Sequence, residues 1–394
     1  MKKFLMATAA GALMVSAASA EDIKLGVIMG FTGPIESLTP AMAAGGEHAM
    51  KEVTESGKLL GGSSVTPVRG DSTCVDAGAA TAAAERLITS DGVKGIVGAD
   101  CSGVTGAILA NVAVPNGVVM ISPSATSPAL SSAEDNGMFF RTSPSDARQG
   151  QVLADVLMEK GFKSAAITYT NNDYGKGLAD SIAAAYAAAG GEVTATTAHE
   201  DGKADYSAEV AALAAAGGDI LIVAGYVDQG GPGIIRASLD TGAFETFALP
   251  DGMIGAALEA NFGDEIEGSV GTVPGAESAN TDMILEAIAS DSYDSSGPYI
   301  GESYDAAALI MLAMQAAGSS DPSAYAGKIM DVANAPGEKI NTGELGKALD
   351  ILAAGGDVDY VGATAVELIG GGEAAGGYRE IVIEGGKITT AKYR

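Results

Sequence analysis

The sequence predicts an α/β protein with two Rossmann-like lobes, each built on a parallel-rich sheet, and a cleft between the lobes. Three observations support this fold class. The chain has 394 residues, more than the roughly 150 residues of one ordinary domain. Short β-branched and apolar runs alternate with longer alanine-rich amphipathic stretches, the pattern of parallel β-α-β units. The alternation restarts after Arg141, so two similar halves follow one another.

The first half alternates strands and helices in this way from Ile23 onward. The expected strands are residues 23–29, 65–68, 95–98 and 118–122. The expected helices between them are residues 39–55, 76–90 and 103–114.

The second half repeats the alternation. Its expected strands are residues 164–169, 192–196, 219–224, 247–249 and 270–273. Its expected helices are residues 149–160, 175–189, 206–216 and 232–241.

Beyond residue 273 the pattern becomes mostly helical and ends in a predicted β-hairpin. The expected helices are residues 281–289, 303–317, 322–333 and 342–353. A glycine-rich tail with Gly370, Gly371 and Gly372 precedes hairpin strands at residues 380–383 and 387–391. Since no segment has the composition of a flexible linker, we expect short crossings between the lobes, with a small-ligand site in the cleft.

Composition excludes several classes of function. The net charge is −28, from 22 Lys and Arg against 50 Asp and Glu. Phosphate backbones and anionic lipid head groups are neutralised by Lys and Arg, so we expect no nucleic-acid partner and no attraction to anionic lipids. The two histidines, His48 and His199, lack metal-ligand spacing, and no G-x-S-x-G motif is present. We therefore expect no catalytic residue, no metal and no cofactor.

The first 20 residues are predicted to be a cleaved secretory signal peptide. Lys2 and Lys3 precede an apolar stretch over residues 4–18, and Ala18-Ser19-Ala20 follows as a cleavage site. The alternative, a membrane anchor, needs about 20 apolar residues. Because the first cysteine is Cys74, we expect an exported, unlipidated protein.

Two cysteines in an exported chain favour one disulfide. Cys74 and Cys101 are 27 residues apart and leave no thiol over. The alternative, a catalytic or metal-binding pair, lacks C-x-x-C spacing and a nearby histidine. Closing a loop of this length contributes about 3 kcal/mol to stability.

Hydroxyl groups follow two neighbouring predicted strands. Ser102 begins a helix directly after one strand, and Ser124 and Thr126 follow the next. Parallel strands bring these positions to one sheet edge, where hydroxyls and free N–H groups at a helix start suit a carboxylate. The alternative is that Ser102 merely caps its helix.

These and further segments resemble one family, the periplasmic branched-chain amino-acid (Leu/Ile/Val) binding proteins of ABC transporters, of the type I periplasmic binding protein fold. The resemblance covers essentially the whole mature chain through the order and spacing of its motifs. The matching segments are residues 21–27, 32–34, 101–102, 121–128, 141–142, 171–177, 225–226 and 250–252.

The resemblance implies a domain division and a hinge. Residues 21–144 and 275–363 would form lobe 1, and residues 145–274 and 364–394 would form lobe 2. The hinge would lie near Pro144, Pro274 and Ala363. The resemblance also implies that Cys74 and Cys101 form the family's disulfide.

The resemblance further assigns the two ends of an amino-acid ligand. Ser102, Ser124 and Thr126 would hold the carboxylate. Asp251, where the family usually has the longer Glu, would hold the ammonium group. Read without the family, Pro250-Asp251-Gly252 is equally a plain turn.

Aromatic and apolar positions complete the implied site. Tyr174 and Tyr226 match aromatic residues that face the ligand, although tyrosines near loops are also commonly just exposed. Leu38 replaces a tyrosine, Tyr299 matches an aromatic residue, and Gly301 falls where a bulky aromatic can sit, so we expect a wider side-chain pocket. Glu302 is either a second anion of the site or an exposed acid at a helix start.

The implied function is capture of a hydrophobic L-amino acid, branched-chain or aromatic, by hinge closure in the periplasm. The partners would be this ligand and an inner-membrane ABC permease with its ATPase subunits, and we expect a monomer. The alternative is the same fold with a non-standard ligand such as a small amide, an ω-amino acid or an aromatic carboxylate. A sensor ectodomain and an exported hydrolase are less consistent with these residues.

Overall fold

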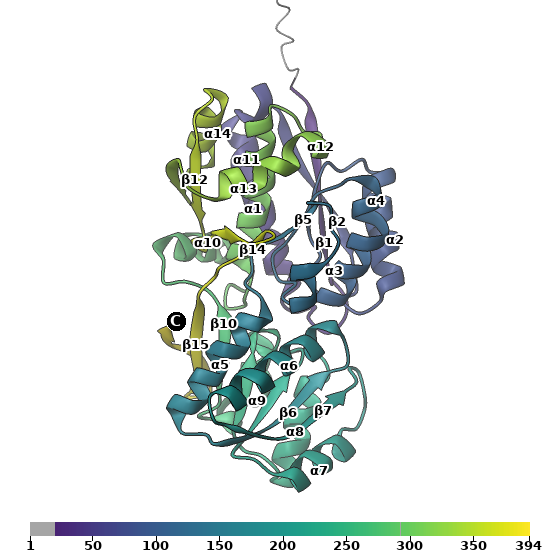
Figure 1. The fold of residues 1–394 in the computed structure, drawn as a ribbon, viewed down its shortest axis with the longest axis vertical. Coiled ribbons are helices and arrows are strands. Elements are labelled where there is room, and N and C mark those ends of the chain that lie inside the picture. Colours follow the sequence, from purple (N-terminus) through teal and green to yellow (C-terminus); the bar gives the residue numbers. More distant parts are fainter. Residues whose placement is uncertain (1–19, 292) are drawn as a thin grey trace, which may run out of the picture.

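The computed structural model describes residues 20–291 and 293–394, so the predicted signal peptide lies outside the described residues except for Ala20. The chain forms two α/β lobes arranged along the long axis of the molecule (Figure 1). Each lobe contains one seven-stranded sheet with helices on both faces. The predicted fold class is thereby confirmed. Among the described residues, no helix is long and apolar enough to span a membrane.

The sheet of lobe 1 is parallel except at one edge, where a short hairpin is added. Its strand order is β13-β14-β5-β4-β3-β1-β2, and only β13 runs antiparallel to its neighbour. The strands are β1 (Asp22–Met29), β2 (Ser64–Asp71), β3 (Ile96–Gly98), β4 (Met120–Ser122), β5 (Phe139–Arg141), β13 (Leu368–Ile369) and β14 (Glu373–Ala374).

The sheet of lobe 2 follows the same plan with an antiparallel hairpin at its edge. Its order is β16-β15-β10-β9-β8-β6-β7, and the predicted C-terminal hairpin is β15–β16. The strands are β6 (Ser164–Thr170), β7 (Glu192–His199), β8 (Ile220–Ala224), β9 (Phe247–Pro250), β10 (Val270–Pro274), β15 (Tyr378–Glu384) and β16 (Lys387–Tyr393).

The helices flank the two sheets. Lobe 1 carries α1 (Thr39–Ser56), α2 (Ala77–Thr89), α3 (Ser102–Ile108), α4 (Val114–Asn116), α10 (Ala279–Ser290), α11 (Ile300–Ala317), α12 (Pro322–Tyr325), α13 (Ile329–Ala333) and α14 (Leu345–Ala353), with a small sheet of β11 (Glu338–Asn341) and β12 (Val358–Gly362). Lobe 2 carries α5 (Asp146–Lys160), α6 (Asp173–Ala188), α7 (Ser207–Ala216), α8 (Gly231–Thr241) and α9 (Ala256–Phe262).

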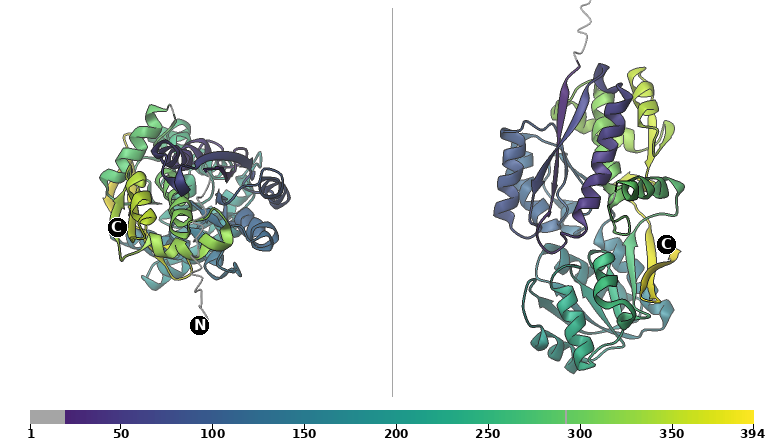
Figure 2. Two further views of the ribbon diagram at one scale, coloured as in Figure 1. Left: turned by 90° about the horizontal axis from the view of Figure 1, so that it is seen from above. Right: turned by 180° about the vertical axis from the view of Figure 1, so that it is seen from behind.

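Burial explains why these segments form these elements. Strands β1 and β8 are almost uniformly apolar and buried, as expected for strands covered on both faces. Helix α11 is buried nearly along its whole length and packs against α1, which lies far away in the sequence (Figures 1 and 2). Gly45 permits this contact, because a Cβ there would lie 2.3 Å from the Ile300 carbonyl oxygen.

The chain crosses between the lobes three times, and the third crossing differs from the expected position. The first two lie between β5 and α5 and between β10 and α10. The expectation of a third crossing at Ala363 is wrong, because β13 and β14 still pair in the sheet of lobe 1. Glu373 is in register with Arg141, so the chain leaves lobe 1 only at residues 375–377. The glycine-rich segment before β14 makes this late hairpin, with Gly372 at φ +104° against Phe140.

Candidate ligand-binding site

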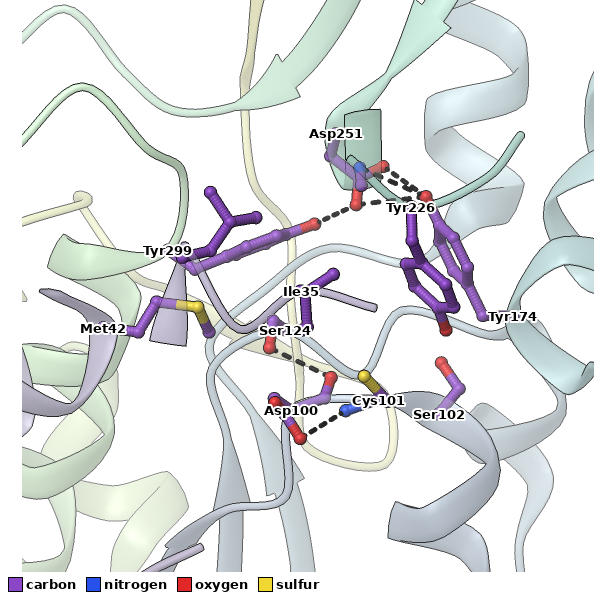
Figure 3. Close-up of a pocket in the computed structure, with 12 residues that line it drawn as sticks. Ile35, Met42, Asp100, Cys101, Ser102, Ser124, Tyr174, Tyr226, Asp251 and Tyr299 are labelled. Carbon is purple, nitrogen blue, oxygen red and sulfur yellow. Dashed lines mark hydrogen bonds between the residues drawn. The ribbon is translucent and has the colours of Figure 1, made fainter. Parts of the chain in front are cut away.

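A cavity lies between the lobes at the carboxyl ends of their strands. Seven of the eight residues expected to contact a ligand line it: Leu38, Ser102, Ser124, Tyr174, Tyr226, Asp251 and Tyr299. Its other lining residues are Ile35, Met42, Asp100, Cys101 and Gly252. Figure 3 shows lobe 1 supplying the serines below and lobe 2 supplying Asp251 above, with the tyrosines between them.

Two serine hydroxyls of lobe 1 form one pole of the cavity. Ser102 Oγ accepts a hydrogen bond from the Ser127 N–H over 3.1 Å, so its own proton can be donated into the cavity. Ser124 Oγ donates to the Asp100 carbonyl oxygen over 3.0 Å and therefore offers lone pairs instead. Ser102 is the first residue of α3 and makes no capping bond, so the alternative role of a helix cap is not observed.

Asp251 forms the opposite pole. It follows β9 in a short helical turn and is 3% exposed. Its Oδ2 accepts from the Tyr299 hydroxyl over 2.7 Å, and the Tyr174 hydroxyl lies 3.4 Å from both carboxyl oxygens. Burial raises the pKa of Asp251, while the Tyr299 and Gln149 side chains act in the opposite direction.

The charges on the cavity wall are unbalanced. Among the twelve described residues that line the cavity, none is Lys or Arg. The Asp100 carboxylate accepts hydrogen bonds from the N–H groups of Gly30 at 2.6 Å and Cys101 at 2.9 Å and from the Ser72 hydroxyl. Asp251, in contrast, has only uncharged partners among the described residues, namely the Tyr299 and Tyr174 hydroxyls and the Gln149 side chain. Because a buried carboxylate needs a positive partner, the wall favours a ligand with a cationic group at Asp251.

Two stacked tyrosines connect the two poles. The rings of Tyr174 and Tyr226 lie 5.2 Å apart with an interplanar angle of 18°. The Tyr174 hydroxyl points to Asp251, whereas the Tyr226 hydroxyl points the other way, toward Ser102 (Figure 3). Tyr226 Oη accepts from Asn172 Nδ2 over 3.2 Å, so its proton can be donated into the cavity. Both rings are buried, which rules out the alternative of exposed loop tyrosines.

Apolar side chains of lobe 1 close the remaining wall. Ile35, Leu38 and Met42 line the cavity, and Leu38 reaches over to Gly255 of lobe 2, where an added Cβ would lie 2.6 Å from its Cδ2. Gly301 does not widen this wall, contrary to expectation. It lines a second cavity at the hinge, because the turn of α11 directs it toward Thr364 and away from the ligand side.

Two other sequence-based interpretations need correction. Thr126 is fully buried and does not line the cavity, because its side chain faces Asp146 at the first crossing. Glu302 is neither a second anion of the cavity nor an exposed acid. It is 5% exposed and faces the hinge cavity together with Arg379, and burial raises its pKa to about 8.

The predicted disulfide joins the loop after β2 to the end of β3. Cys74 and Cys101 are bonded, with their Cα atoms 5.2 Å apart, which confirms the prediction. The bridge fixes the segment that leads into Ser102 and so holds the serine pole in place.

A direct contact between lobes was not predicted. The Asp228 carboxylate of lobe 2 accepts from the Ser37 N–H over 2.8 Å, and the Asp228 N–H donates to the Pro34 carbonyl over 3.1 Å. The lobes are therefore closed over the cavity. A single acid in a glycine-rich loop carries no local sequence signal for a contact 191 residues away.

Comparisons with known proteins agree with this geometry. Residues 22–340 match the sequence model of a family described as periplasmic binding protein. The chain is 30% identical over 316 residues to the leucine-specific-binding protein of Salmonella typhimurium, covering 79% of this chain and 84% of that protein. It is 27% identical over 331 residues to the leucine-, isoleucine-, valine-, threonine- and alanine-binding protein of Pseudomonas aeruginosa, covering 83% and 86% of the two chains.

Solved structures share the fold. A leucine-binding protein from Thermotoga maritima superposes with a TM-score of 0.78 at 20% identity, covering 94% of this chain and 98% of that chain. A solute-binding protein from R. palustris in complex with 4-hydroxybenzoate superposes with a TM-score of 0.76 at 19% identity, covering 95% and 97%.

Proposed function

We propose a function for this chain, which belongs to the periplasmic binding protein family. It captures a hydrophobic L-amino acid, branched-chain or aromatic, by closure of its lobes. It acts in the periplasm as a monomer and delivers the ligand to an inner-membrane ABC permease with its ATPase subunits. One relative is named as specific for leucine and another as binding leucine, isoleucine, valine, threonine and alanine, and an apolar wall suits such side chains.

The buried, cation-free setting of Asp251 carries this proposal. The ligand's ammonium group would pair with Asp251, whose carboxylate has only uncharged partners among the described residues. The ligand's carboxylate would accept from the Ser102 and Tyr226 hydroxyls at the other pole. Charge-assisted hydrogen bonds at both ends orient the zwitterion and leave its side chain against Ile35, Leu38 and Met42.

The residues proposed to bind the ligand come from both lobes, which explains how a ligand drives closure. Lobe 1 contributes Ser102 and lobe 2 contributes Asp251 and Tyr226. A zwitterion contacts Ser102 and Asp251 together only when the lobes are closed, so it binds the closed form more tightly and shifts the population toward it.

Charge also distinguishes the proposed ligand from an aromatic carboxylate. The R. palustris neighbour holds 4-hydroxybenzoate, an anion without an ammonium group. Such a ligand would leave the Asp251 charge unpaired in a closed cavity, which costs several kcal/mol. Small amides and ω-amino acids remain as alternatives, since they also offer N–H donors to Asp251.

The test is a thermal-shift panel of L-amino acids, ω-amino acids, amides and aromatic acids on protein that has been unfolded and refolded to remove bound ligand. A ligand at 100 times its Kd stabilises the protein by about 2.7 kcal/mol. We expect shifts with leucine, isoleucine, valine or phenylalanine, and loss of those shifts in Asp251→Asn. The exposed Asp155→Asn on α5 is the matched control. A response to aromatic acids but not to amino acids would contradict the proposal.

A further inference from the structure

Asp146 is a buried carboxylic acid beside the ligand cavity that the proposed function does not use. It is the first residue of α5, at the first crossing, and is fully buried. Within residues 20–291 and 293–394, neither of its carboxyl oxygens has a hydrogen-bond partner. Two nearby buried acceptors also lack partners. They are Oγ1 of Thr126, whose hydroxyl lies close enough to Asp146 to lower its pKa, and Oε1 of Gln149, one helical turn further along α5.

The charged groups around Asp146 come from several elements. Burial is the largest cause of the raised pKa of Asp146, and Asp251, after β9, raises it further. Tyr174 of α6 and Tyr378 of β15 face both carboxyl groups. Arg141 at the end of β5 lowers the pKa of Asp146, while Arg148 on α5 is exposed and acts on Tyr378.

Arg141 does not form an ion pair with Asp146. Its guanidinium donates to two backbone carbonyls of lobe 1, to the Ser131 hydroxyl and to Glu373. Two buried carboxyl groups, Asp146 and Asp251, therefore lie close enough to influence each other, and neither forms an ion pair with another described residue. Both cannot be ionised there at low cost, and the ligand's ammonium group would compensate only one of them.

We propose that Asp146 is a positioning residue of the ligand site, uncharged while the lobes are closed, and that its ionisation opposes closure around the ligand. This inference rests on the proposed function. As a neutral acid, Asp146 can donate its proton to the unpaired acceptor Thr126 Oγ1. That would satisfy polar atoms that otherwise stay unpaired in the interior.

The location of Asp146 connects its charge to the hinge. Its N–H donates to the Thr126 carbonyl of lobe 1 over 2.9 Å. Close to the second crossing, Gln149 Nε2 donates to the Thr272 carbonyl over 3.0 Å. Just after the third crossing, the Tyr378 hydroxyl lies 3.5 Å from the Ser145 carbonyl. The start of α5 therefore contacts all three crossings. An ionised Asp146 needs water, which the closed lobes exclude.

The sign of the pH effect follows from the direction of this pKa shift. Burial and Asp251 raise the pKa of Asp146 in the closed structure. On this proposal, opening of the lobes readmits water to Asp146 and lowers its pKa, so closure takes up a proton at any pH between the pKa of the open form and that of the closed form. Ligand affinity therefore falls as the pH rises through that interval, by at most tenfold per pH unit.

The first experiment measures the Kd of leucine by calorimetry from pH 5 to pH 9 for the wild type, Asp146→Asn and the control Asp155→Asn. Asparagine keeps the size of the neutral acid and cannot ionise. We expect the ratio of wild-type Kd to Asp146→Asn Kd to rise with pH, and Asp155→Asn to follow the wild type. A constant ratio would overturn the proposal, as would weaker binding by Asp146→Asn at every pH, since either result means that ionisation of Asp146 does not oppose closure.

A second experiment needs no variant. The carboxyl ¹³C resonance of Asp146 in the wild type is followed from pH 5 to pH 9, without ligand and with saturating leucine. We expect a protonated acid at pH 5, with a titration midpoint that rises further when leucine is present. An ionised carboxylate across the whole range in both samples would overturn the inference. If no amino acid in the thermal-shift panel raised the unfolding temperature, the proposed function would be rejected, whatever this titration shows.

Discussion

Tyr299 and Asp251 join the two lobes across the cavity, with the Tyr299 hydroxyl donating to Asp251 Oδ2 over 2.7 Å. Tyr299 stands just before α11 in lobe 1, and its backbone has a φ of +68°, a conformation that bulky residues rarely adopt. Such a conformation costs on the order of 1–3 kcal/mol and persists only where the surroundings hold it. Tyr299 of lobe 1 therefore orients Asp251, and the same hydrogen bond to Asp251 of lobe 2 helps to hold Tyr299 in its conformation.

Tyr299→Phe should weaken ligand binding by removing this hydrogen bond while leaving the ring in the wall. A hydrogen bond to a charged group contributes about 1.5–3 kcal/mol, so we expect Kd to rise by roughly ten- to a hundredfold in calorimetry. Tyr393→Phe, on an exposed tyrosine of β16, is the control. An unchanged Kd in Tyr299→Phe would show that the bond is not part of the ligand-bound state.

The two serines at the opposite pole should differ in their contribution. Ser102 can donate its proton to a ligand carboxylate, whereas Ser124 already donates to the Asp100 carbonyl. We therefore expect Ser102→Ala to raise Kd by about thirtyfold, for a charge-assisted bond of about 2 kcal/mol, and Ser124→Ala to raise it by less than about threefold. Calorimetry with a ligand identified in the panel measures both, and equal losses would refute this assignment of donor and acceptor.

Much of the fold could be predicted because its signals are local. Buried parallel strands such as β1 and β8 are apolar runs, and amphipathic helices such as α1 are recognisable by their period. The hairpin β13–β14 was missed because its strands have two residues each, too few to show a period. Helix α5 begins three residues before its predicted start, since Ser145 caps it by accepting from the Ala147 N–H.

The candidate site was predicted by resemblance more than by pattern. Ser102 and Ser124 follow neighbouring strands, a relationship visible in the sequence alone, whereas Asp251 and Tyr299 gain a ligand-binding interpretation only from the family's motifs. The contacts that surround them depend on tertiary structure. Asp146 beside Asp251 and Asp228 against Ser37 join residues from distant segments, and no local pattern carries such a pairing. The error at Glu302 has the same origin, because its burial depends on three crossings converging at the hinge.

Glu302→Gln should stabilise the protein at alkaline pH. Burial, the largest effect, raises the pKa of Glu302 to about 8 in the folded state; Asp305 raises it further and Arg379 lowers it. The folded protein therefore binds this proton more tightly than the unfolded chain, whose Glu has an ordinary pKa near 4.3. The stability linked to Glu302 is complete below that value and is lost as the pH rises toward 8.

Urea unfolding at pH 5, 7 and 9 measures this effect. We expect the wild type to lose on the order of 4 kcal/mol relative to Glu302→Gln between pH 5 and pH 9, since glutamine cannot ionise. Glu286→Gln, on an exposed position of α10, should follow the wild type and so separate this effect from the general repulsion of an acidic chain. If wild type and Glu302→Gln lose stability in parallel, then Glu302 gains compensation from Arg379 or from water in the hinge cavity, and its burial does not control the alkaline limit of stability.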